Sequence, residues 1–204
     1  MVAGNTSGRT IYIDIVADAT RLLAGDAAGE AAGESAEGEA VTDPAGADVK
    51  AVQPGSRFIS ASAAAPSARR AAGKLVLDLD AGDTIRFSAK SGSNNFEEAA
   101  LIEDIGPIGG CDTLQNFALV NEERGAVAPR DYDRVLPARS SQREFWFWQC
   151  EAATDGAPHC SVLLAVYDRD EQGQPRLAGR YRWTLQLTVR LTSTTSPTHQ
   201  GETS

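Results

Sequence analysis

Residues able to do chemistry are scarce in this chain of 204 residues, which has two histidines and three cysteines. His199 lies in the polar C-terminal stretch, so His159 is the one imidazole expected in the folded part. Nucleophilic catalysis would need His159 as a base beside a thiol, for which Cys111 is the candidate. Cys160 follows His159 directly and points to the opposite face of the strand. We therefore expect no catalytic residue and no enzyme.

Metal binding has little support in the spacing. Zinc needs three or four clustered nitrogen and sulfur ligands, which this sequence does not space together. Asp168-Arg-Asp170-Glu-Gln-Gly matches the start of a calcium loop, but the twelfth position is Gly179 instead of a carboxylate. Residues 81–87 resemble a strand of cupredoxin-like sandwiches, yet copper there usually needs a methionine and Met1 is the only one. We expect no metal and no other cofactor.

Aromatic residues offer the other candidate site. Residues 143–152 are predicted to form a strand with large rings on both faces: Phe145, Trp146, Phe147 and Trp148. Burial on both sides of the strand would explain them structurally. The functional alternatives are a subunit interface or a sugar-stacking platform, because amphipathic rings are favoured at such surfaces. We expect at least one ring outside the primary core.

The clearest structural pattern lies in residues 163–189. Strict alternation over 181–189 predicts a strand that buries Trp183 with its neighbours on one face. A polar turn over 168–179 joins it to residues 159–168, which are apolar on both faces and therefore central. Further strands are expected over 10–17, 56–62, 96–105 and 115–120, and one helical turn follows Asp18.

Turn residues suggest how these strands connect. Residues 74–89 read as a hairpin around 80–83, and Asp155-Gly156 as a second hairpin between 143–152 and 159–168. Residues 63–73 and 121–142 read as loops. Eight or nine strands without a long helix predict an all-β, antiparallel β-sandwich (jelly-roll or Ig/cupredoxin-like) as a single domain over 10–191.

Charge is concentrated in one segment. The chain carries −9, and residues 25–50 contribute −6 of it. These residues have no apolar periodicity, so we expect a disordered Ala/Gly/Glu insert over about 25–55, a flexible start at 1–9 and a disordered tail at 192–204. The charges of the insert are Asp26, Glu30, Glu34, Glu37, Glu39, Asp43 and Asp48 against Lys50.

The charge balance and the cysteines bound the partners and the compartment. An acidic chain without a basic stripe argues against nucleic acid and against an anionic membrane surface. No run of about 18 apolar residues is present to span a membrane. Three cysteines and no export signal favour a cytoplasmic protein. A disulfide between Cys150 and Cys160, facing each other across the second hairpin, stays open as an alternative.

Three short blocks carry a family resemblance. They are residues 11–24 (IYIDIVADATRLLA), 75–87 with a Gly-Asp pair, and 167–183 with Asp-Arg-Asp and Gly-x-Tyr-x-Trp spacing. They resemble the bacterial inclusion-body protein family of the PixA/AidA type. Thr184-Leu185 departs from the Asp-Pro common there, and the acidic insert is longer. The motif positions are Asp14, Gly82, Asp83, Asp168, Asp170, Gly179, Tyr181 and Trp183.

The resemblance implies a cytoplasmic, all-β, non-enzymatic protein that accumulates in inclusions. Together with the aromatic strand it favours a self-associating protein, expected as a homo-oligomer and most simply a twofold dimer, since that is the commonest symmetric assembly. The alternative is a lectin-like module that binds glycans on the surplus rings.

Overall fold

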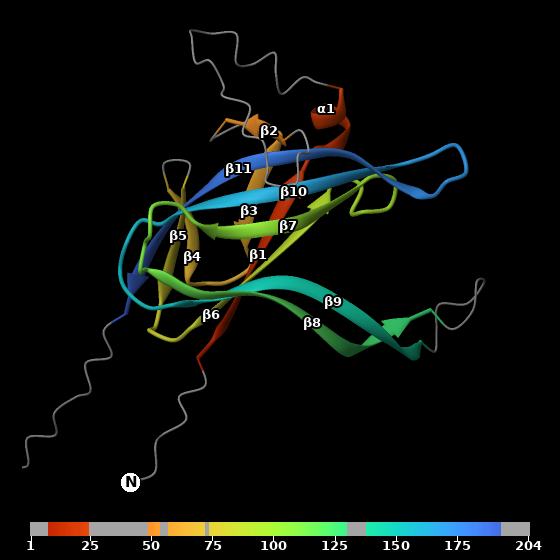
Figure 1. Cartoon of the computed structure of the whole chain (residues 1–204). Coiled ribbons are helices and arrows are strands. Elements are labelled where there is room, and N and C mark those ends of the chain that lie inside the picture. The colour runs from red at the N-terminus through yellow and green to blue at the C-terminus, as the bar shows by residue number, and fades with distance from the viewer. Residues whose placement is uncertain (1–7, 25–48, 54–56, 72–73, 130–137, 193–204) are drawn as a thin grey trace, which may run out of the picture.

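The computed structural model of the chain describes residues 8–24, 49–53, 57–71, 74–129 and 138–192. Two β-sheets pack against each other, and at one end two strands of the first sheet diverge from the second sheet (Figure 1). The first sheet has the order β3 (Ile59–Ala63), β1 (Thr10–Ala17), β6 (Thr84–Ser91), β9 (Arg139–Ala152) and β8 (Leu114–Ala128).

The second sheet has the order β4 (Ala68–Ala71), β5 (Lys74–Leu79), β11 (Pro175–Leu191), β10 (His159–Arg169) and β7 (Ala99–Pro107). A further strand, β2 (Val49–Val52), pairs with β11. The helix α1 (Ala19–Leu23) follows β1, where one helical turn was predicted after Asp18. The all-β sandwich is confirmed, with mixed sheets: β1 pairs with β6 in parallel, and β11 pairs in parallel with β2 and β5.

One hydrophobic core joins the two sheets. It takes the alternate residues Ile11, Ile13 and Ile15 from β1 and the predicted inward face of β11. Trp183 is 6% exposed, so its predicted place in the core is confirmed. The predicted pairing of β10 with β11 is also confirmed, and β10 lies between β11 and β7 as its two apolar faces indicate.

Two predicted hairpins are wrong. β5 and β6 flank the turn at 80–83, but they lie in different sheets. β9 and β10, on either side of Gly156, also lie in different sheets. Alternation tells which face of a strand is apolar, whereas it does not tell which strand lies beside it. An arch that carries the chain from one sheet to the other therefore leaves the same sequence pattern as a hairpin.

The cysteine pairing that depended on the second hairpin is wrong as well. Cys150 lies in β9 and Cys160 in β10, and both are buried free thiols. Burial raises the pKa of the Cys160 thiol to about 12 and raises that of Cys150 still further. These two residues act as small apolar core residues.

Three predicted loops contain strands. The insert was expected to run to about residue 55, but 49–52 form β2, and the loop expected over 63–73 contains β4. The loop expected over 121–142 is the largest error, because β8 continues to Ala128 and β9 begins at Arg139. These residues are polar because the strands are solvent-exposed. The expectations for residues 1–7, 25–48 and 193–204 lie outside the described residues.

Candidate functional site

The two candidate residues for catalysis, His159 and Cys111, are not linked by a hydrogen bond between their side chains in the described part of the chain. His159 is exposed at the start of β10, and Cys111 is half-buried in the loop before β8. The backbone N–H of Ile108 donates to the His159 carbonyl at 2.7 Å, which brings this loop to the strand. In the described part of the chain, no hydrogen bond links the imidazole to the Cys111 thiol, and no group of three His, Cys, Asp or Glu side chains is placed to hold a metal ion.

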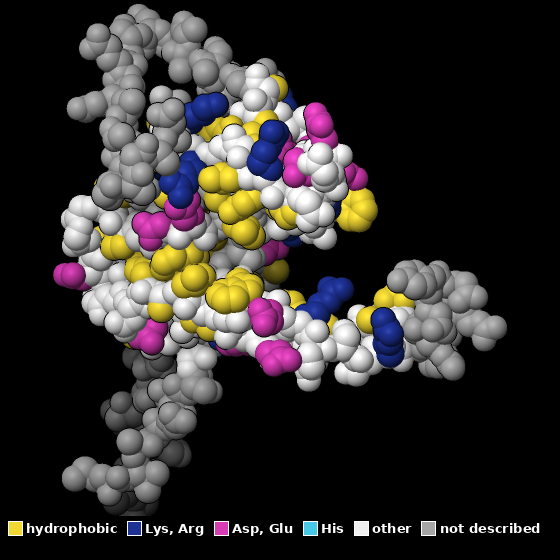
Figure 2. Space-filling view, turned by 45° about the vertical axis from the view of Figure 1, so that its right-hand side comes forward, with side chains coloured by type: hydrophobic (Ala, Val, Ile, Leu, Met, Phe, Trp, Pro, Cys, Tyr) yellow, Lys and Arg dark blue, Asp and Glu magenta, His cyan; other side chains and the backbone are white. Residues whose placement is uncertain are grey.

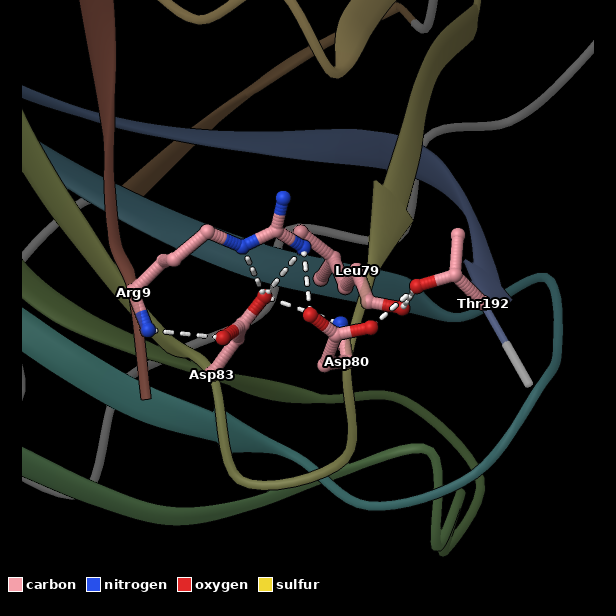
Figure 3. A network of polar contacts seen from close by, with 5 residues as sticks. All are labelled: Arg9, Leu79, Asp80, Asp83 and Thr192. Atoms are coloured by element: carbon pink, nitrogen blue, oxygen red, sulfur yellow. Dashed lines mark hydrogen bonds and ion pairs between the residues drawn. The ribbon is translucent and has the colours of Figure 1, made fainter. Parts of the chain in front are cut away.

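The Gly-Asp motif holds the turn between β5 and β6 (Figure 3). Asp83 is 1% exposed, and its carboxylate accepts the backbone N–H of Arg9 (2.7 Å), the Arg9 guanidinium (2.9 Å) and the backbone N–H of Asp80 (2.9 Å). The Thr192 hydroxyl, at the end of the described chain, donates to the Leu79 carbonyl at 3.1 Å. Gly82 adopts φ +86°, which favours glycine. Asp83 therefore ties the N-terminal strand to the turn, and Thr192 ties the C-terminal strand to the residue before it.

The Asp-Arg-Asp motif shapes the turn between β10 and β11. The Arg176 guanidinium donates two hydrogen bonds to Asp168 (2.7 and 3.1 Å), which lowers the pKa of that carboxyl. Asp170 accepts the backbone N–H groups of Gln172 (2.9 Å) and Gln174 (2.7 Å). Both carboxylates thus hold the turn through hydrogen bonds.

The remaining family positions lie in the core or on the sheet surface. The Tyr181 hydroxyl donates to the Leu22 carbonyl of α1 at 2.9 Å. A Cβ on Gly179 would lie 2.9 Å from that ring, so the spacing Gly-x-Tyr leaves room for it. Asp14, on the surface of β1, accepts from Ser88 (2.8 Å) and pairs with Lys90 (3.1 Å). None of these positions lines a site for chemistry.

The aromatic residues belong to a projecting two-stranded arm, defined here as residues 120–128 of β8 and 139–147 of β9. β6 pairs with β9 only as far as Phe87 opposite Trp148. Beyond that point, β9 has β8 as its one paired neighbour among the described residues. Figure 2 shows the arm extending from the body with a gap between them. Most of the arm leaves no strand signal in the sequence, because its polar residues lack apolar alternation.

The four rings divide between the root of the arm and its surface. The Trp148 indole packs against the core, and its Nε1–H donates to the Ile102 carbonyl at 3.1 Å. Phe147 is buried on the opposite face, where the Arg86 guanidinium lies 4.2 Å from the ring centre. Phe145 remains 43% exposed and Trp146 58% exposed. Rings therefore lie outside the core on both faces of the strand.

A charged cluster supports the Phe147 side. Arg86 pairs with Glu122 at 2.7 Å, and Arg124 contacts the same carboxylate. Burial works against ionisation of Glu122, but the hydrogen bonds from the two guanidinium groups prevail and lower its pKa. Tyr12 adds a second ring 5.9 Å from the Arg86 guanidinium. The cluster joins residues 36 and 74 positions apart, which no local sequence signal indicates.

Two hollows flank β9 where it leaves β6. One, of about 320 Å³, is lined by Tyr12, Arg86, Arg124, Phe145 and Phe147 among others. The other, of about 340 Å³, includes Leu101, Ile102, Leu119, Trp146 and Trp148 in its lining. Both are mainly apolar. The arm therefore presents exposed rings beside concave surfaces, an arrangement typical of binding surfaces.

The fold and the arm define a mixed-sheet β-sandwich with an exposed aromatic ribbon. The chain belongs to the PixA inclusion body protein family, whose model matches residues 58–189. A crystal structure of an inclusion body protein (PixA) from Burkholderia cenocepacia J2315 is similar in fold, with a TM-score of 0.64 and 21% sequence identity over 92% of this chain and 99% of that one. The comparison with curated proteins found no match. The family resemblance seen in the sequence is confirmed.

The helical content of the described residues bears on membrane insertion. No helix there is long and apolar enough to cross a membrane, since α1 has five residues.

Proposed function

We propose that this chain is a non-enzymatic, cytoplasmic protein that associates with copies of itself through the arm. The observation that carries the proposal is the exposure of Phe145 and Trp146 on a ribbon whose two outer edges have no paired strand among the described residues. A two-stranded ribbon is at best marginally stable in water without a further covering surface. Open strand edges also favour pairing with another chain.

The family supplies the second support. Its model describes an inclusion body protein, and inclusions require contacts between copies. The net charge of −9 does not favour nucleic acid or an anionic membrane surface as a partner. Catalysis has no support from a cluster of metal ligands among the described residues.

Light scattering on two variants tests the proposal. Phe145→Ser with Trp146→Ser should lower the average mass of the associated protein toward that of the monomer, because it removes the exposed rings. Phe96→Ser is the matched control, since Phe96 is a still more exposed ring (72%) outside the arm. The proposal fails if the wild-type protein stays monomeric at about 100 μM, where a specific contact of micromolar affinity would be populated.

Glycan binding is the second candidate function. The hollow beside Tyr12 and Phe145 combines half-exposed rings with the polar groups of Arg86 and Arg124. Such a surface suits a sugar, whose apolar face stacks on rings while its hydroxyls bind polar groups. A glycan array run on the same sample as the light scattering would separate the two functions. Binding that Tyr12→Ala abolishes, with the mass unchanged, would favour the glycan.

A further inference from the structure

The charges of the arm are sorted by face. In the register of β8 with β9, Glu123 lies directly opposite Glu144, and at the next pair Arg124 lies directly opposite Arg143. The only irregularity in this pairing falls between Gln115 and Ala118, so the register is unbroken through the arm. Because successive residues of a strand point to opposite faces, the acidic pair and the basic pair lie on opposite faces of the ribbon.

Each charged pair shares its face with one exposed ring. Glu144 is two residues from Trp146, and Glu123 lies beside it, so these residues form what we call the Trp146 face. Arg143 is two residues from Phe145, and with Arg124 it forms the Phe145 face. Glu122 also lies on the Phe145 face, but Arg86 and Arg124 already pair with it.

The net charges of the two faces therefore differ in sign. On the Phe145 face, positive charges outnumber negative ones: the guanidinium groups are those of Arg86, Arg124, Arg139 and Arg143, and the carboxylate is that of Glu122. In the described part of the Trp146 face, Glu123 and Glu144 meet no basic residue of the arm and make no ion pair. Like charges directly opposite on neighbouring strands destabilise a ribbon, so this pattern does not serve the stability of the arm by itself.

We propose that the Trp146 face of one copy docks on the Phe145 face of the next copy, in a head-to-tail contact. This inference rests on the proposed self-association and gives it a geometry. The contact places the two carboxylates of one arm against the guanidinium groups of another and covers one exposed ring from each copy. Complementary charge across a contact favours association and fixes its register.

A twofold contact through either face is disfavoured by the same charges. Two Trp146 faces would bring four carboxylates together, and two Phe145 faces would bring their excess guanidinium groups together. A head-to-tail contact also leaves one face free on each end copy. Such heterologous contacts continue as open chains when the rotation between copies does not close a ring. The assembly should therefore grow with concentration without stopping at a dimer.

Charge reversal tests the geometry. One variant combines Glu123→Arg with Glu144→Arg, and the other combines Arg124→Glu with Arg143→Glu. Both keep a like-charged pair across the ribbon. Arg124→Glu also removes the contact of Arg124 with Glu122, which Arg86 still pairs with. Each variant carries one sign on both faces and should stay monomeric alone. An equimolar mixture should associate again.

Light scattering across a concentration series gives the outcome. Wild-type mass that rises continuously, loss of association in each variant and its recovery in the mixture support the head-to-tail contact. A wild-type mass that levels off at twice the monomer, or variants that associate like the wild type, overturns it while leaving self-association in place. A wild-type protein that stays monomeric overturns the proposed function itself. Association should also weaken with added salt, which screens exposed charges.

Discussion

The body of the sandwich and the arm differ in the surroundings of their aromatic and charged residues. In the body, Asp83 is enclosed and each of its oxygens accepts hydrogen bonds, and Trp183 is packed among strands of both sheets. In the arm, Trp146 is largely exposed and Glu123 faces another carboxylate. The Asp83 carboxylate and the Trp183 ring are enclosed by the fold itself, whereas the Trp146 ring and the Glu123 carboxylate face solvent. The family motifs thus maintain the fold, and the arm outside them is the candidate for function.

The largest expected effect is in the core. Trp183→Ala should lower the free energy of unfolding by about 3–5 kcal/mol, because it removes a buried ring and leaves a cavity. Trp183→Phe should cost much less, since the Trp183 Nε1–H has no hydrogen-bond partner among the described residues. Trp146→Ala should change stability by less than about 0.5 kcal/mol, as for an exposed residue. Denaturant unfolding of the three variants measures these differences. A loss for Trp146→Ala as large as that for Trp183→Ala would contradict the contrast between body and arm.

The body was largely predictable from sequence and the arm was not. Alternation at 181–189 identifies the buried face that contains Trp183, because one face of a strand must be apolar to be buried. The same signal places β5 and β6 correctly but cannot tell that they lie in different sheets. The ribbon beyond Asn121 has no buried face, so it leaves no signal of this kind. Its aromatic end was recognised only because rings occur on both faces.

A smaller effect is expected at the turn between β5 and β6. Asp83→Ala should cost about 2–3 kcal/mol, because the Arg9 and Asp80 N–H groups lose a charged acceptor. Asp14→Ala is the control on the same sheet, where the exposed pair with Lys90 should be worth less than about 1 kcal/mol. Thermal and denaturant unfolding measure both. Equal losses would show that the Asp83 network has no special role in the body.

The buried thiols give a smaller, pH-dependent effect. The folded pKa of Cys160 is about 12, whereas that of an unfolded thiol is about 8.5. A raised pKa means that the contribution to stability is intact below about pH 8 and declines as pH rises above 9, by at most about 1.4 kcal/mol per pH unit. Cys160→Ala should therefore make the alkaline decline in unfolding free energy shallower. An identical slope in the wild type and in Cys160→Ala would contradict burial of this thiol.

Hydrogen exchange at two protein concentrations tests the contrast between body and arm most directly. Mass spectrometry would compare backbone exchange at about 1 μM and about 100 μM, a range over which a contact of micromolar affinity becomes populated. Amides of residues 120–128 and 139–147 should become more slowly exchanging at the higher concentration, because a second copy covers the ribbon, while those of β10 and β11 should not change. Equal exchange of the arm at both concentrations, or concentration-dependent protection confined to the body, would contradict the account.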